Sequence, residues 1–295
     1  MTAATTTAVT VTGPRQRRER RRGGAPNPAF YLPLVVLFAF ALGLIVIFLF
    51  DSLKTQSQLA TSPLGLPLHP QWSNFTDAWT TAAMGAGFVN SLVIVFGTVA
   101  GVCVVAGCGA YAMARLDLPG TGGFMTYLLV SSSLPIQLFL VPLFFLWTRL
   151  GLYDTRFGLI VIYWAIFSPF ATLLLRSFLI NIPRDYDSAA RIDGAGEVAI
   201  LFRIILPIAW PGFLTIALVS ALSAYNEFLL AVTFIQSNDK MPISLTFFSF
   251  QEGYTQNYSL ISAAGVMMMA PMIVLFLLLQ RRFVDGITSA GLGAT

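Results

Sequence analysis

Long stretches without a charged side chain constrain the fold of this chain more than any other feature. No charged residue lies between Asp77 and Arg115, and the segment Phe30–Phe50 is also free of charge. A helix needs about 20 apolar residues to cross the hydrocarbon core of a bilayer. Charged residues make up only 10% of the 295, against about 25% in ordinary soluble domains. The chain is therefore predicted to be an all-α polytopic membrane protein, because a helix satisfies its own backbone hydrogen bonds in lipid.

Six segments have the length and hydropathy of membrane spans. They are 30–50, 85–112, 124–147, 157–175, 208–232 and 259–280. The alternative for the first segment is the apolar part of a signal peptide. We predict an uncleaved span instead, because the run is too long for a signal peptide and no clear small-residue cleavage site follows it. The third and fourth segments contain Pro135, Pro142 and Pro169, and proline inside a membrane helix often borders a cavity.

The distribution of lysine and arginine predicts the orientation of these spans. An even number of spans places both termini on one face of the membrane. The opposite face holds four of the 17 lysines and arginines, namely Lys54, Arg149, Arg156 and Lys240, and the face of the termini holds all the others. Because short cytoplasmic loops are enriched in these residues, both termini and the 183–207 segment are predicted to be cytoplasmic.

The chain is thereby divided into three parts. Residues 1–29 contain six arginines and little that can form a core, so we predict a disordered basic cytoplasmic tail. A nucleic-acid-binding arm is the alternative, and an anchor that fixes the membrane orientation is favoured over it. Residues 30–283 are predicted to form the six-helix membrane domain. Residues 284–295 are predicted to be a cytoplasmic C-terminal tail.

The segment Pro183–Pro207 is a polar, charged island between two long apolar runs. Proline suits the first position of a helix, so a helix is predicted to begin at Pro183. Asp185 and Asp187 then fall in its first turn, where negative charge complements the helix dipole. Gly194 and Gly196 are predicted to end this helix and permit a turn. A second helix is predicted to begin near Glu197, so the island is read as helix, bend, helix.

The spacing within this island resembles the EAA loop of the permease subunits of bacterial ATP-binding-cassette (ABC) importers. That loop has the pattern E-A-A-x3-G-x9-I-x-L-P, and this chain has Ser188-Ala189-Ala190, three residues, Gly194, nine residues, then Ile204-Ile205-Leu206-Pro207. The run AARIDGAG resembles the carbohydrate-uptake, maltose-type branch of the family. One position departs from the pattern: Ser188 stands where the family has Glu, and Asp187 lies beside it.

The resemblance covers nearly the whole chain beyond residue 29 and implies a fold, a location and a set of partners. The fold is that of a type I ABC importer permease, with six transmembrane helices and a cytoplasmic coupling helix, in the bacterial cell membrane. The partners are a second homologous permease, two cytoplasmic ATPase subunits, an extracytoplasmic solute-binding protein and membrane lipid, with no nucleic acid. The solute is a sugar or oligosaccharide.

The same resemblance implies which residues contact the ATPase. The residues expected to do so are Asp187, Ser188, Ala189, Ala190, Arg191, Asp193, Gly194 and Pro207. The alternative is a cytoplasmic helical hairpin without a partner. The terminal stretch Arg281–Thr295 resembles a family segment that reaches towards the ATPase, and a simple positively charged flank is the alternative there.

The chain shows no sequence signature of its own energy source or of covalent chemistry. A phosphate-binding loop needs G-x4-G-K-[ST], and the two lysines, Lys54 and Lys240, lack the glycines. No cofactor is therefore predicted, and ATP is expected to bind the partner ATPase. Cys103 and Cys108 are read as packing residues, and the single histidine, His69, disfavours a transition-metal site. We predict a non-catalytic transport subunit.

Three polar residues near apolar runs are candidates for the solute pathway: Asn226, Glu227 and Gln137. Glu227 is the only carboxylate well inside an apolar run, and ionisable groups in spans usually face a cavity or a partner. Docking of the binding protein and structural hydrogen bonding are the alternatives for it. The rival function is a secondary transporter driven by an ion gradient. That class needs intramembrane charge pairs, which the sequence lacks.

Overall fold

The structure is a computed structural model that describes residues 31–253 and 257–292. The chain separates into two compact units, Met1–Val46 and Ile47–Thr295. In the first unit the described residues form most of helix α1 (Leu32–Ser52), which ends in the second unit. Its 21 residues match the first predicted span. The basic tail predicted for residues 1–29 lies outside the described residues.

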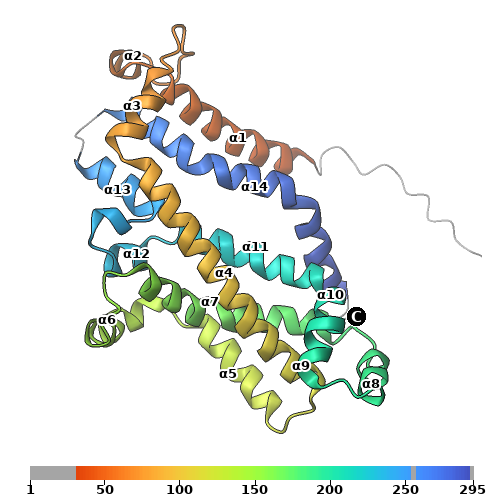
Figure 1. Cartoon of the computed structure of the whole chain (residues 1–295). Coiled ribbons are helices and arrows are strands. Elements are labelled where there is room, and N and C mark those ends of the chain that lie inside the picture. The colour runs from red at the N-terminus through yellow and green to blue at the C-terminus, as the bar shows by residue number, and fades with distance from the viewer. Residues whose placement is uncertain (1–30, 254–256, 293–295) are drawn as a thin grey trace, which may run out of the picture. The chain divides into compact units, whose positions relative to one another are not determined.

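The regular elements of the second unit are all helices, and no strand occurs among its described residues (Figure 1). Its elements are α2 (Gln56–Thr61), α3 (Ser73–Thr81), α4 (Met84–Arg115), α5 (Thr121–Ser133), η2 (Ile136–Phe139), α6 (Leu140–Arg149), α7 (Arg156–Leu179), α8 (Asp185–Ile192), α9 (Glu197–Ile200), η3 (Leu201–Ile205), α10 (Leu206–Ile208), α11 (Trp210–Asn226), α12 (Leu229–Phe234), η4 (Asn238–Lys240), α13 (Ile243–Gly253) and α14 (Tyr258–Leu292).

Four helices are long and apolar enough to cross a membrane as single pieces: α1, α4, α7 and the part of α14 from Tyr258 to Leu278. Two bent pairs pass the same test of length and composition. Thr121–Ser133 and Ile136–Arg149 meet at 91°, and Glu197–Ile208 and Trp210–Asn226 meet at 83°. The described part of the chain therefore has up to six spans if each bent pair counts as one, in agreement with the predicted number.

Proline chemistry explains the first of these bends. Leu134 precedes Pro135 and has an extended backbone, with φ −74° and ψ 132°. A proline disfavours helical backbone in the residue before it, so α5 ends there. The prediction of one continuous third span over 124–147 was wrong in this respect.

Four other boundaries differ from the prediction. The fifth span, expected over 208–232, is interrupted because Glu227 is extended and α12 begins again at Leu229. Helix α8 begins at Asp185 and not at Pro183. The loops expected on either side of the bundle contain short helices, namely α2, α3 and α13. Helix α14 continues through the first part of the predicted C-terminal tail, to Leu292.

The centre of the second unit is the packing of α4 against α7 and α11, which lie side by side in Figure 1. Glycines on α4 allow large side chains of α7 to pack directly against the α4 backbone. A Cβ atom at Gly101 would lie 2.0 Å from the Trp164 ring of α7, and the Trp164 Nε1 donates to the Gly97 carbonyl oxygen at 2.9 Å. Small residues serve this purpose in membrane helices, where close van der Waals packing drives association.

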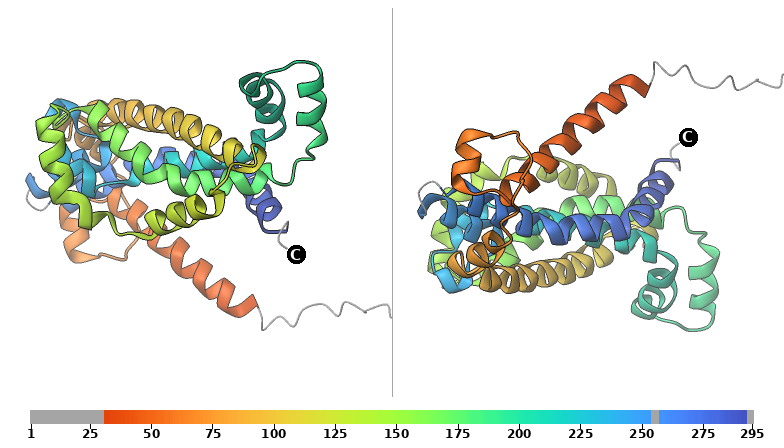
Figure 2. Two further views of the ribbon diagram at one scale, coloured as in Figure 1. Left: turned by 90° about the horizontal axis from the view of Figure 1, so that it is seen from below. Right: turned by 90° about the horizontal axis from the view of Figure 1, so that it is seen from above.

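The loops of the second unit gather at two opposite ends of this helix packing. One end carries α6, α12 and α13, and the other carries α8, α9 and α10 (Figures 1 and 2). At the first end, Asp154 accepts hydrogen bonds from the Gln236 and Ser237 backbone and from Lys240. At the second end, Arg184 pairs with Asp117. The loops predicted to share a membrane face therefore contact one another.

Candidate functional site

The 183–207 segment projects from one end of the second unit, beyond the ends of α4 and α7 (Figure 2). It consists of α8, a turn at 193–196, and α9 followed by η3 and the start of α10. The expected order of helix, bend and helix is present.

Gly194 makes the turn between α8 and α9. It has φ +82°, a left-handed conformation that residues with a Cβ atom adopt only at a cost. Its N–H donates to the Arg191 carbonyl oxygen, and the Ala195 N–H donates to the Ala190 carbonyl oxygen. This pair of bonds is the Schellman arrangement that closes a helix C-terminus. Gly196, by contrast, has an ordinary φ of −76°.

The residues expected to contact the ATPase divide into a buried set and an exposed set. Asp187 and Ala190 are buried, and Ala190 packs in the cluster that includes Tyr111, Ala114 and Leu179. The other expected residues are exposed: Ser188, Ala189, Arg191, Asp193, Gly194 and Pro207. The exposed set remains accessible to another protein, whereas Asp187 faces the membrane bundle.

Asp187 forms an ion pair with a residue that was not among the predicted site residues. Its Oδ2 lies 3.4 Å from Nη1 of Arg115, the last residue of α4, and the two side chains are only 2% and 1% exposed. Nη2 of Arg115 also donates to the Leu179 carbonyl oxygen at the end of α7, at 2.6 Å. Arg115 therefore joins α4, α7 and α8. The available signal was its position as the first charge after a long charge-free run.

Two further contacts hold the segment to the same end of α4. The Tyr111 hydroxyl donates to Glu197 Oε2 at 2.5 Å, and Arg191 binds the same carboxylate at 2.7 and 3.2 Å. Arg184 forms a two-pronged pair with Asp117 at 2.7 and 2.8 Å. The hydrogen bond from the Arg184 guanidinium holds the pKa of the Asp117 carboxyl below its usual value.

The 183–207 segment also exposes three large apolar side chains. Tyr186 is 51% exposed, Ile192 is 86% exposed and Val198 is 72% exposed. Apolar side chains exposed on a projecting segment are available to contact another protein or lipid. The predicted ATPase contacts were the small and charged residues of this segment, and these three apolar residues were not among them.

Glu227, a candidate for the solute pathway, is fully engaged within the chain. Its carboxylate accepts hydrogen bonds from the Leu230 and Ala231 N–H groups at the start of α12, at 2.9 and 3.2 Å. The Tyr163 hydroxyl of α7 donates to it at 2.8 Å. Glu227 therefore caps the N-terminus of α12. Asn226 and Gln137 are exposed, on α11 and η2.

A hollow of about 390 Å³ lies between α5, α7 and α11. Serine hydroxyls and two phenylalanine rings contribute to its lining. These residues are Ser132, Ser220, Ser223, Phe167 and Phe170. Ser132 is the member of the consecutive serines 131–133 that lines this hollow.

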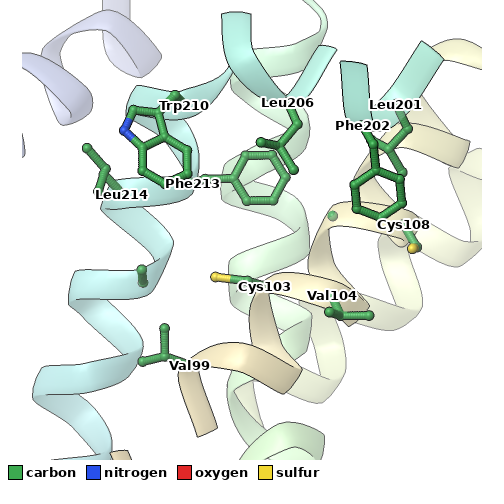
Figure 3. A pocket seen from close by; sticks show the side chains of 12 residues that line it. Val99, Cys103, Val104, Cys108, Leu201, Phe202, Leu206, Trp210, Phe213 and Leu214 are labelled. Carbon is green, nitrogen blue, oxygen red and sulfur yellow. The ribbon is translucent and has the colours of Figure 1, made fainter. Parts of the chain in front are cut away.

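A second hollow, of about 290 Å³, is lined by apolar residues of α4, η3, α10 and α11 (Figure 3). Both cysteines, Cys103 and Cys108, are free and contribute to it. Trp210, Phe213 and Phe202 form the opposite wall in Figure 3. Because its lining is apolar, this hollow suits a hydrocarbon chain and does not suit a polar solute.

Comparison with known proteins adds a family to this geometry. The sequence profile of the family described as "binding-protein-dependent transport system inner membrane component" matches residues 104–289, more than half of the chain. This range contains α7 to α11 and therefore the whole 183–207 segment.

Similar proteins cover most of the chain. The diacetylchitobiose uptake system permease protein of Streptomyces coelicolor is 33% identical over 242 residues, which are 81% of this chain and 80% of that protein. The arabinooligosaccharides transport system permease protein of Bacillus subtilis is 29% identical over 277 residues, covering 90% and 98%.

A solved structure shares the fold. A chain of a bacterial ABC transporter involved in the import of the acidic polysaccharide alginate superposes with a TM-score of 0.75 and 21% sequence identity, covering 86% of this chain and 95% of that one. The resemblance stated from the sequence is confirmed by the profile match, the relatives and this fold. The chain is a multi-pass membrane permease, and it belongs to the family of inner membrane components of binding-protein-dependent transport systems.

Proposed function

We propose that this chain is the membrane permease subunit of an ATP-driven importer for a sugar or oligosaccharide. The observation that carries the proposal is the 183–207 segment, which projects from one end of the helix bundle and exposes Tyr186, Ile192 and Val198. The relatives named above are permeases for diacetylchitobiose and for arabinooligosaccharides, which supports a carbohydrate as the solute. The family description itself implies a solute-binding protein.

The 183–207 segment, from here on the coupling segment, docks into a groove on a cytoplasmic ATPase subunit. A short helix in a groove is a recurrent mode of protein recognition. The apolar side chains supply the contact area, and the exposed Ser188, Ala189, Arg191 and Asp193 surround them. Nucleotide binds to the ATPase, and this chain carries no cofactor and no catalytic group of its own. Both termini and the coupling segment are cytoplasmic.

The complete transporter contains this chain, a second homologous permease, two ATPase subunits and an extracytoplasmic binding protein. The solute passes along the hollow between α5, α7 and α11. Its combination of aromatic rings and hydroxyl groups suits a neutral hydroxylated solute, because ligand sites combine apolar walls with a few polar groups. Glu227 acts as a cap at the outer end of this route and holds α12 in place.

Uptake into vesicles tests the proposal. Vesicles containing the whole complex, with binding protein outside, are offered labelled diacetylchitobiose or an arabino-oligosaccharide. Uptake of at least one of these sugars is expected with ATP trapped inside and no ion gradient. The control vesicles have a proton or sodium gradient and no ATP, and they are expected to take up none. Uptake in the control vesicles would support the rival, a gradient-driven secondary transporter.

A further inference from the structure

The contacts between the coupling segment and the membrane bundle converge on one end of one helix. Arg115 ends α4 and binds Asp187 of α8, Tyr111 one turn earlier binds Glu197 of α9, and Asp117 just after α4 binds Arg184. Helix α4 is distant from the segment in sequence. Both short helices of the segment are therefore fixed to α4.

The buried Arg115–Asp187 pair contributes more to the orientation of α8 on α4 than to the stability of the fold. Both side chains are at most 2% exposed, and removing two charges from water costs about as much as their attraction returns. The contact distance of 3.4 Å also exceeds the roughly 2.7–2.9 Å of a strong charge-assisted hydrogen bond. Loss of either partner would leave the other charge buried and unpaired, so the two side chains are held near each other.

The chain neighbours of the segment are attached to it less directly. Helix α7 leads into α8 through residues 180–184, and its backbone accepts a hydrogen bond from this pair where Arg115 donates to the Leu179 carbonyl oxygen. Helix α11 follows an 83° bend at Ala209. Helix α8 is therefore joined to α4 by a buried ionic contact, whereas α11 is joined to the segment across a bend.

We propose that α4 is the helix that the coupling segment moves, and that Arg115 and Asp187 are the positioning residues that fix the two together. Asp187 then serves within the chain and is not an ATPase contact. The proposal rests on the proposed function, since it concerns how movement of the docked segment is passed to the pathway. Helix α4 packs along α7 and α11, which line the solute hollow.

The substitution Asp187→Asn tests this in the complete complex, because it keeps the shape of the side chain and removes its charge. The matched control is Asp185→Asn, the same change on an exposed side chain of the same helix. The measurements are ATPase co-purification, ATP hydrolysis, and molecules of the imported sugar taken up per ATP hydrolysed. For Asp187→Asn we expect unchanged co-purification and at least fivefold less sugar per ATP. The control is expected to match the unaltered protein in all three.

Two outcomes would overturn the inference. Loss of ATPase co-purification on Asp187→Asn would make Asp187 part of the docking surface. An unchanged ratio of sugar to ATP would make the pair merely structural. Failure of the unaltered complex to bind any ATPase would instead refute the proposed function, so the two failures are distinguishable.

A second variant guards against a fold defect in the first. The double substitution Arg115→Met with Asp187→Leu replaces the ion pair with apolar side chains, which is often tolerated where a single charge is not. We expect this variant to assemble normally and still to import less sugar per ATP. Restored coupling in the double variant would overturn the inference.

A distance measurement reads the same contact directly. Spin labels are attached at Asp185→Cys and Leu118→Cys, both exposed positions, after replacement of Cys103 and Cys108 by serine. The distribution of distances between the two labels is expected to be narrow both with and without ATP. It is expected to become broader when Asp187→Asn is added. A distribution equally narrow in both backgrounds would contradict the proposal.

Discussion

At the scale of single residues, the turn after α8 depends on one backbone angle. Gly194 has φ +82°, and no atom lies within 4 Å of the position that its Cβ would take. A substitution there meets no steric neighbour, so any effect arises from the backbone conformation alone. Gly196, two residues on, has an ordinary φ and offers a control with equally open surroundings.

We predict that Gly194→Ala weakens docking of the coupling segment. The left-handed conformation costs a residue with a Cβ atom about 1–2 kcal/mol, which unwinds or tilts the end of α8. Co-purification of the ATPase is expected to fall severalfold, and Gly196→Ala is expected to leave it unchanged. Equal loss in both variants would show that the φ of Gly194 is not the cause.

A second residue-scale prediction concerns Glu227. Replacing it with alanine leaves the Leu230 and Ala231 N–H groups and the Tyr163 hydroxyl without their acceptor. Loss of a helix cap costs about 0.5–2 kcal/mol, so a lower melting temperature of the purified protein is expected. Asn226→Ala, at an exposed neighbour, serves as the control. A specific loss of sugar affinity at unchanged melting temperature would instead favour a direct pathway role for Glu227.

At the scale of elements, the close approach of α4 and α7 decides how the bundle packs. The Trp164 ring lies where a Cβ of Gly101 would be, and the Ile160 side chain lies 2.7 Å from the corresponding position at Gly97. These glycines leave room on α4 for the large side chains of α7 to pack against its backbone. A second irregularity is the π-helical turn η3 (Leu201–Ile205), which lies shortly before the bend at Ala209.

We predict that Gly101→Leu prevents normal packing of α4 on α7. Overpacking a close contact costs about 1–3 kcal/mol, and the large Trp164 ring has to move. A marked loss of monodisperse protein after detergent extraction is expected by size-exclusion chromatography. Gly122→Leu on α5, where no atom lies within 4 Å of the added Cβ, is expected to behave normally. Normal yields for Gly101→Leu would mean that the two helices separate more easily than this packing implies.

At the scale of the whole chain, ionic and hydrogen-bonded contacts join loops far apart in sequence. Asp154 binds Lys240 at 3.0 Å and accepts hydrogen bonds from the Ser237 hydroxyl and from the Gln236 and Ser237 backbone. Burial alone would raise the pKa of Asp154, but the hydrogen bonds from Ser237, Gln236 and Lys240 outweigh it and lower the pKa well below its usual value. This contact ties the loop after α6 to the loop after α12.

The depressed pKa of Asp154 predicts a pH dependence. A carboxyl whose pKa is lower in the folded state stabilises the fold above its unfolded pKa of about 3.9, and the contribution disappears as pH falls towards the folded value. The melting temperature of Asp154→Asn is therefore expected to lie below that of the unaltered protein at pH 6 to 8, with the gap closing below about pH 4. A gap independent of pH would assign the effect to lost hydrogen bonds and not to charge.

The sequence alone determined the class of fold, the number of spans and the position of the coupling segment. Charge-free runs such as 78–114 leave helices in lipid as the solution, since backbone groups have no water to bind there. The spacing from Ser188 to Pro207 identified the family, and the glycine at 194 marked the turn. These are local properties, set by composition and by backbone preferences of neighbouring residues.

Only the tertiary structure decided which side chains meet. Asp187 was expected to contact the ATPase because it lies beside Ser188, where the family has Glu, yet its side chain is buried against Arg115, 72 positions earlier. The hydrogen bond of Glu227 to the Tyr163 hydroxyl likewise joins parts of the chain that its place in the sequence does not bring together. A helix places residues three and four positions apart on one face, but which face is buried depends on the helices that pack against it, and these contacts are not local in sequence.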